Sequence, residues 1–167
     1  LLKLLRISAA TLTEDDVTFM ISPRLNAASR MDTPQTAAAL LAATDPVRAH
    51  ALAEELNRIN DTRKVLVAST VKDANKRLKT LGEVPLIVMG SPAWRPRLLG
   101  LVAGKLAEAH GKTTFLWGRE GGEELRGSCR SAGEVNVVEL MAKAGNVFSN
   151  FGGHAASGGF SVAEEHV

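Results

Sequence analysis

The sequence contains one cysteine, Cys129, and no long apolar run. A single cysteine excludes an internal disulfide framework and a zinc site built from cysteines, and it fits a reducing compartment. The longest stretch without Asp, Glu, Lys or Arg covers 144–163 and includes five glycines, so it is unsuited to a transmembrane span. We therefore expect a cytoplasmic protein without a membrane partner.

Clustered metal ligands are also lacking. All six aspartates stand at position 73 or earlier, and the four histidines are isolated from one another. Metal-dependent phosphoester hydrolysis needs carboxylates and histidines that converge, so we expect no metal ligand and no catalytic residue in this chain. A phosphate-binding P-loop at Gly111-Lys112-Thr113 is excluded, because its first glycine would fall on Leu106.

An excess of charge of either sign is missing too. The chain has 20 basic and 18 acidic residues, a net charge of +2. This value is too small to indicate a nucleic-acid partner by itself, so any basic surface must come from local clustering.

The first 45 residues predict short helices. Thr13 precedes three acidic residues, a pattern typical of a helix start, and we expect Pro23 to end that helix. Pro34 follows Thr33 as the first residue of another helix. The intervening segment 22–30 is expected to be irregular.

A long linker helix is predicted next. From Pro46 to Leu81 the sequence has no glycine and no further proline, and apolar residues recur at steps of three and four. This pattern predicts one helix or two in line. A single helix would extend about 54 Å at ~1.5 Å per residue.

After Gly82 the pattern changes to alternating strands and helices, which indicates a small α/β lobe. The predicted fold class is thus α/β, with a helical connector at 1–81 that includes the long linker helix, followed by the α/β lobe at 82–167. The strands are expected at 84–89, 113–117, 125–130 and 159–162, and the helices at 97–110, ended by Gly111, and at 136–148.

A glycine-rich segment is the first candidate for anion binding. Gly152 and Gly153 can free the backbone so that successive N–H groups point at one anion, and His154 adds a further donor. The alternative is a simple turn from helix to strand in which the histidine is a packing residue.

Two further groups could bind phosphate. Ser128 and Arg130 lie on one face of a predicted strand, where a hydroxyl and a guanidinium can clamp a phosphate. The alternative is an exposed polar face of an edge strand. Arg24, Asn26 and Arg30 form the third group, for which helix capping and surface charge are the alternative.

Several motifs follow one another along the chain. They are Pro-Arg-Leu-Asn-Ala-Ala-Ser-Arg-Met at 23–31, the long helix, an apolar run at 86–89 followed by Trp94, Gly-Ser-Cys-Arg-Ser at 127–131, and Phe-Gly-Gly-His-Ala-Ala at 151–156. Taken in this order, they resemble the motifs of the RecJ family. RecJ proteins are 5′-to-3′ exonucleases specific for single-stranded DNA, in the DHH phosphoesterase superfamily. The resemblance extends over most of the chain.

The resemblance implies roles for the α/β lobe. Gly152, Gly153 and His154 match the signature of the DHH-associated domain, which helps to hold substrate phosphate. Ser128 and Arg130 match the family's Ser-x-Arg pair, which is implicated in gripping the 5′-terminal phosphate.

The resemblance also implies a function for the chain as a whole. Arg24, Asn26 and Arg30 match a segment beside the substrate cleft. The expected function is the substrate-binding C-terminal part of a RecJ-like exonuclease in DNA repair and recombination. We expect the family's N-terminal catalytic lobe to be absent from this chain, and we expect Mn²⁺ or Mg²⁺ to be bound by that lobe and not by this chain. The expected partners are single-stranded DNA, the catalytic DHH lobe in cis, and a single-strand-binding protein or helicase.

Two other functions stay open. The chain could be the substrate lobe of an oligonucleotide or cyclic-dinucleotide phosphodiesterase, or a non-enzymatic interaction module.

The chain also departs from the family pattern, since Ser29 and Cys129 stand where glycine is common and Arg95-Pro96-Arg97 replaces His-Pro-Gly. We expect one cleft to gather the arginines at 24, 30, 95, 97 and 130.

Overall fold

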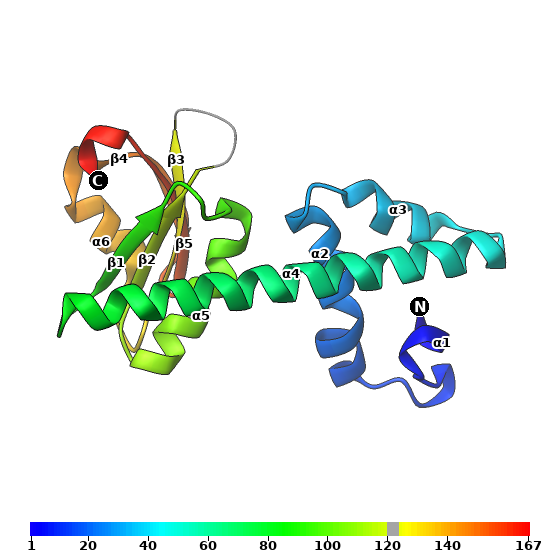
Figure 1. The fold of residues 1–167 in the computed structure, drawn as a ribbon. Coiled ribbons are helices and arrows are strands. Elements are labelled where there is room, and N and C mark those ends of the chain that lie inside the picture. The colour runs from blue at the N-terminus through cyan, green and yellow to red at the C-terminus, as the bar shows by residue number, and fades with distance from the viewer. Residues whose placement is uncertain (120–123) are drawn as a thin grey trace. The chain divides into compact units, whose positions relative to one another are not determined.

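The longest element is α4 (Pro46–Leu81), a single 36-residue helix, which is one of the two alternatives that the sequence predicts. The computed structural model describes residues 1–119 and 124–167 (Figure 1). Their contacts form two units, Leu1–Leu66 and Val67–Val167, so the division falls within α4. The sequence instead assigns the whole helix to the connector, and that domain boundary stays a prediction.

The first unit is helical. Thr13 caps its helix as predicted, because the Asp16 N–H donates to Thr13 Oγ1 at 3.2 Å and the Thr13 N–H donates to Asp16 Oδ2 at 3.0 Å. The unit contains α1 (Leu2–Leu5), η1 (Ala9–Thr11), the π-helical turn η2 (Asp16–Ile21), α2 (Ser22–Arg30), α3 (Pro34–Ala42) and the first part of α4.

The predicted stop at Pro23 is wrong. The helical run continues through η2 into α2, and Pro23 lies in the first turn of α2. In η2 the Ser22 N–H bonds to the Val17 carbonyl, five residues back. Pro23, which has no amide hydrogen, therefore lies where the hydrogen-bond spacing changes from π to α. The helix continues because no donor is needed at this position. The segment 22–30 is a helix and not an irregular loop.

The second unit is a sheet between helices. The described residues form a five-stranded sheet in the order β1-β2-β3-β5-β4, in which β1 and β2 are parallel and the other pairs are antiparallel. Its elements after α4 are β1 (Ile87–Ser91), α5 (Pro96–His110), β2 (Thr114–Gly118), β3 (Leu125–Arg130), α6 (Val137–Lys143), η3 (Gly145–Val147), β4 (Phe148–His154), β5 (Ser157–Val162) and η4 (Glu164–His166).

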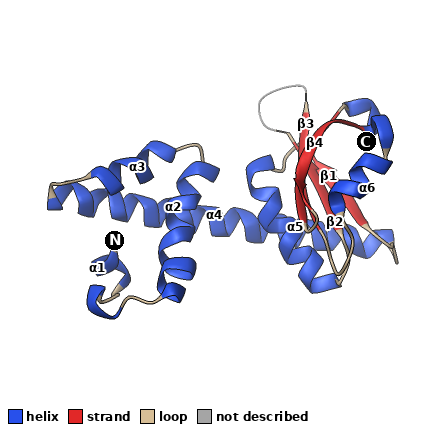
Figure 2. Cartoon of the chain, turned by 180° about the vertical axis from the view of Figure 1, so that it is seen from behind, coloured by secondary structure: helices blue, strands red, loops and turns tan. Residues whose placement is uncertain are grey.

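The two sides of this sheet carry different helices (Figure 2). On one side α6 packs on β4 and β5, and Met141 and Val137 join a buried cluster with Cys129, Phe115 and Phe160. On the other side α5 packs on β2 and β3. None of the described helices is long and apolar enough to cross a membrane.

The fold class is confirmed, and the differences are local. β3 has its predicted bounds, and α5 ends as predicted at Gly111, which is left-handed at φ 61°. The helix predicted to reach residue 148 stops at Lys143, because Gly145 takes a left-handed φ of 63°. The chain after it forms β4 and β5, where the sequence indicates a glycine-rich turn and only the strand 159–162.

Candidate functional site

Strands β3, β5 and β4 place the predicted phosphate-binding residues of the second unit in two adjacent rows. Residues that pair across antiparallel strands share a face of the sheet. The glycine row consists of Ser128, Gly159 and Gly152, and the arginine row consists of Arg130, Ser157 and His154. Neighbouring strands are ~4.8 Å apart, so the backbones of Arg130 and His154 are separated by about 10 Å.

Both rows lie on the side of the sheet that carries α5, which we call the open face where it spans β3, β5 and β4. Ser128 Oγ and Arg130 Nη2 lie 3.6 and 3.0 Å from the point where a Cβ on Gly100 of α5 would stand. Gly152, Gly159 and His154 are exposed. The structure therefore brings together the Ser-x-Arg pair and the Gly-Gly-His segment, which are more than 20 residues apart in the sequence.

Arg130 is held beside Ser128. Its Nη1–H donates to the Cys129 carbonyl at 2.7 Å, and its side chain lies along α5 over Gly100 and Gly104. The absence of a side chain at Gly100 leaves room for the guanidinium. A planar guanidinium next to a hydroxyl matches the oxygens of a phosphate group.

Two glycines of the open face are not required by the fold. No described atom lies within 4 Å of where a Cβ on Gly152 would stand, and the nearest to Gly159 is a carbonyl oxygen at 3.7 Å. Neither residue has a left-handed φ. Since neither packing nor backbone conformation demands glycine here, their effect is to leave the main chain accessible to a ligand.

Gly153 differs from its neighbour Gly152. Its φ is 148°, and an added Cβ would overlap the carbonyl oxygen of Ser157 and the Cα of Gly158. The anion-binding loop suggested by the sequence is therefore a tight β4–β5 hairpin in which Gly153 is structural. Two backbone N–H groups bond to carbonyls at the tip of this hairpin. The Ser131 N–H donates to the Ala156 carbonyl and the Val137 N–H donates to the Ala155 carbonyl, each at 2.9 Å.

A third row on the open face was missed by sequence reasoning. The amide row consists of Arg126, Ser161 and Asn150, which pair across the same three strands. It lines a groove of about 540 Å³ together with Gly152 and Gly159. The strand alternation of Arg126 with Ser128 and Arg130 was the signal that could have revealed it.

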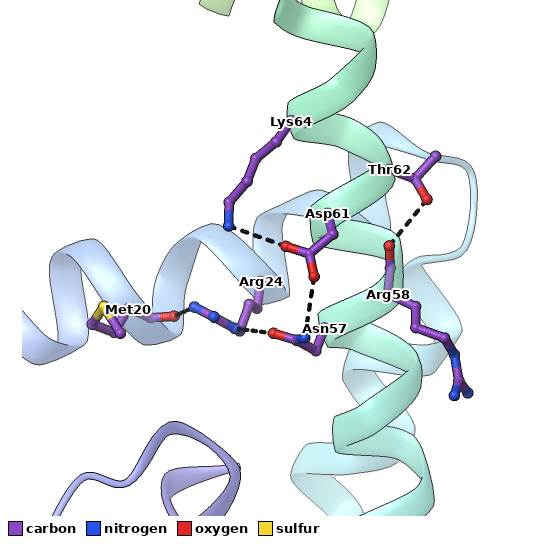
Figure 3. A network of polar contacts seen from close by, with 7 residues as sticks. All are labelled: Met20, Arg24, Asn57, Arg58, Asp61, Thr62 and Lys64. Atoms are coloured by element: carbon purple, nitrogen blue, oxygen red, sulfur yellow. Dashed lines mark hydrogen bonds and ion pairs between the residues drawn. The ribbon is translucent and has the colours of Figure 1, made fainter.

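In the helical unit, Arg24 joins α2 to α4 (Figure 3). Its Nε–H donates to Asn57 Oδ1 at 2.9 Å, and the Asn57 amide donates to Asp61 Oδ2 at 3.2 Å. Lys64 Nζ donates to the other oxygen of Asp61 at 3.1 Å. Arg24 thus has a packing role between two helices, and its role in substrate binding stays a prediction.

The other two predicted residues of α2 lie elsewhere on that helix. Asn26 is exposed and Arg30 is half-buried, and their spacing of four residues places them on the same side. Burial, with the positive charges of Arg30 and Arg24, lowers the pKa of the Arg63 guanidinium from its ordinary value. Arg63 on α4 is therefore a third cation of this region, which the sequence did not single out.

Arg95 and Arg97 lie at the start of α5, in the second unit with Arg130, whereas Arg24 and Arg30 belong to the first. Convergence of these five arginines on one cleft stays a prediction.

Cys129 is fully buried, and burial raises the pKa of its thiol to about 11. The thiol therefore stays protonated near neutral pH and is not a nucleophile.

The comparison with family models decides the family. The model described as the DHHA1 domain matches residues 83–167. The chain belongs to the DHHA1 domain family. The matched residues include β1 to β5, so all three rows of the open face are part of this DHHA1 domain.

Similar proteins extend the comparison to the helical unit. The single-stranded-DNA-specific exonuclease RecJ of Haemophilus influenzae is 31% identical over 92% of this chain, and that of Thermus thermophilus is 32% identical over 89%. A crystal structure of Thermus thermophilus RecJ in complex with Mn²⁺ matches 99% of the chain with a TM-score of 0.88 and 29% identity. These results confirm the resemblance to RecJ.

The chain spans 28% and 21% of the length of those two relatives and 24% of the chain in that crystal structure. Solved RecJ structures are described as Mn²⁺ and Mg²⁺ complexes. Within residues 1–119 and 124–167, no group of three or more His, Cys, Asp or Glu could hold a metal ion.

Proposed function

We propose that this chain is the substrate-binding C-terminal part of a RecJ-like 5′-to-3′ exonuclease and that its open face grips single-stranded DNA. The terminal phosphate binds between Ser128 and Arg130, and the glycine row lets the strand approach the main chain. The observation that carries the proposal is the pair of exposed glycines, Gly152 and Gly159, which packing does not require. They lie beside Ser128 and Arg130, which together we call the clamp.

The clamp accounts for a preference for a strand end. A terminal phosphate carries more negative charge than a phosphodiester, and Arg130 and Ser128 can donate several hydrogen bonds to its oxygens. Because Arg130 lies against α5, a phosphate reaches it along the side of that helix. On this proposal a flexible single strand adapts to the position beside α5 more readily than the rigid end of a duplex.

Cleavage is assigned to a catalytic lobe outside residues 1–167, which would lie in cis on the same polypeptide and bind the divalent metal. By itself the chain is expected to bind DNA and to cut none. A cytoplasmic location, a role in DNA repair and recombination, and contacts with a single-strand-binding protein or helicase belong to the same proposal.

A titration with matched DNAs tests this function. We expect the chain to bind a 5′-phosphorylated single strand about tenfold more tightly than the 5′-hydroxyl strand, since one charge-assisted contact is worth ~1.5 kcal/mol. Affinity should fall with salt as counterions are released. Equal affinity for a duplex with the same 5′-phosphate would contradict the proposal, and preferential binding of a cyclic dinucleotide would favour a small-nucleotide phosphodiesterase.

A further inference from the structure

The amide row lies one step along the open face from the glycine row. Alternate residues on a strand are ~6.8 Å apart, so Arg126, Ser161 and Asn150 stand about that far from Ser128, Gly159 and Gly152. The groove of about 540 Å³ joins the two rows and is continuous with the two exposed glycines. This volume is in the range of pockets that hold a small organic molecule. A group attached to a phosphate at Ser128 and Arg130 can therefore reach it.

The electrostatics of the amide row disfavour a second phosphate. Arg126 Nε lies 3.4 Å from Glu124 Oε2, and the Glu124 carboxylate also accepts a hydrogen bond from Ser149 Oγ at 3.2 Å. The carboxylate offsets the charge of Arg126 and would repel a nearby anion. The ligand that fits this part of the groove is polar but uncharged.

The side chains around the groove suit a nucleobase. Arg126 is 70% exposed, and a planar guanidinium can stack on an aromatic ring. The Asn150 side chain is exposed and offers both donors and an acceptor, as the edge of a base requires. The Ser161 hydroxyl adds a further donor and acceptor on the middle strand.

We propose that the groove holds the nucleoside of the terminal nucleotide, with Arg126 stacked on the base and Asn150 bonded to its edge. This inference rests on the proposed function, because it takes the terminal phosphate to lie at Ser128 and Arg130. On this proposal the smallest ligand that makes both the phosphate contact and the base contact is a 5′-mononucleotide. Neither Arg126 nor Asn150 stands out in the sequence motifs.

Two small ligands separate the base contact from the phosphate contact. Thymidine 5′-monophosphate and 2-deoxyribose 5-phosphate share the sugar and the phosphate, and only the first has a base. NMR titration of the chain is expected to show about tenfold tighter binding of the nucleotide, consistent with the usual worth of base stacking. Arg126→Ala and Asn150→Ala should each reduce this preference and leave the affinity for the sugar phosphate unchanged.

Two further variants sharpen the test. Arg126→Lys keeps the charge but lacks the planar group, so it should lose the preference much as Arg126→Ala does. Lys143→Ala removes one exposed charge on α6, on the other side of the sheet, and should change neither affinity. Equal binding of the two ligands to the unmodified chain would overturn the nucleoside groove and leave the phosphate clamp intact. Binding of neither would overturn the clamp as well.

Discussion

Gly153→Ala is expected to lower the free energy of unfolding of the second unit by about 3 kcal/mol, whereas Gly152→Ala should change it by less than ~0.5 kcal/mol. At position 153 the φ of 148° strains any side chain, and a Cβ would overlap the backbone of Ser157 and Gly158. At position 152 a Cβ meets no described atom within 4 Å. Urea unfolding of the two variants, followed by circular dichroism, measures the difference.

The same two variants separate an effect on folding from an effect on DNA binding. Gly152→Ala adds a methyl group to the floor of the open face, so we expect a folded chain that binds 5′-phosphorylated single-stranded DNA about tenfold more weakly, equivalent to ~1.4 kcal/mol. If Gly152→Ala destabilises the chain as much as Gly153→Ala, then both glycines are structural. If it binds DNA normally, the strand does not lie over the glycine row.

Arg130→Ala is expected to weaken binding of 5′-phosphorylated single-stranded DNA by about 10- to 100-fold, the usual cost of losing hydrogen bonds to a charged group. Arg130→Lys should recover part of this loss, because it keeps the charge but cannot bind two phosphate oxygens in a planar fork. Fluorescence anisotropy with a labelled strand gives the affinities.

The matched control for this series is Lys143→Ala, which removes one positive charge from α6 on the opposite side of the sheet. It should bind like the unmodified chain at moderate salt. A loss similar to that of Arg130→Ala would mean that net charge, rather than the clamp, attracts DNA. The 5′-hydroxyl strand should be nearly insensitive to Arg130→Ala, since the clamp acts on the terminal phosphate.

Local signals in the sequence predict much of the fold. Thr13 forms its cap because the hydroxyl and the acidic residue of the first turn are three positions apart, and α4 is one helix because nothing in it breaks the pattern. The prediction that Pro23 ends its helix is wrong, because a proline ends a helix only where a backbone N–H is needed at that position for a hydrogen bond. Here the change from π to α spacing removes that need.

The site depends on pairings that local patterns do not reveal. Gly152 and Gly153 are alike in sequence, and only the register of β4 with β5 shows that the fold requires Gly153 and not Gly152. Arg126 lies in the groove because of the register of β3 with β5, two strands that α6 and β4 separate in the sequence. Arg63 lies near Arg24 and Arg30 because α4 returns beside α2, which spacing along the chain cannot show.

The central claim is that single-stranded DNA lies on the open face, and mapping its contacts by NMR tests that claim most directly. The backbone amide signals of a ¹⁵N-labelled chain are followed while a 5′-phosphorylated strand is added. The account predicts the largest shifts at Ser128, Arg130, Gly152, His154 and Gly159, with small shifts at Leu140 and Met141 on the α6 side. The largest shifts on α6, with the open face unaffected, would contradict it.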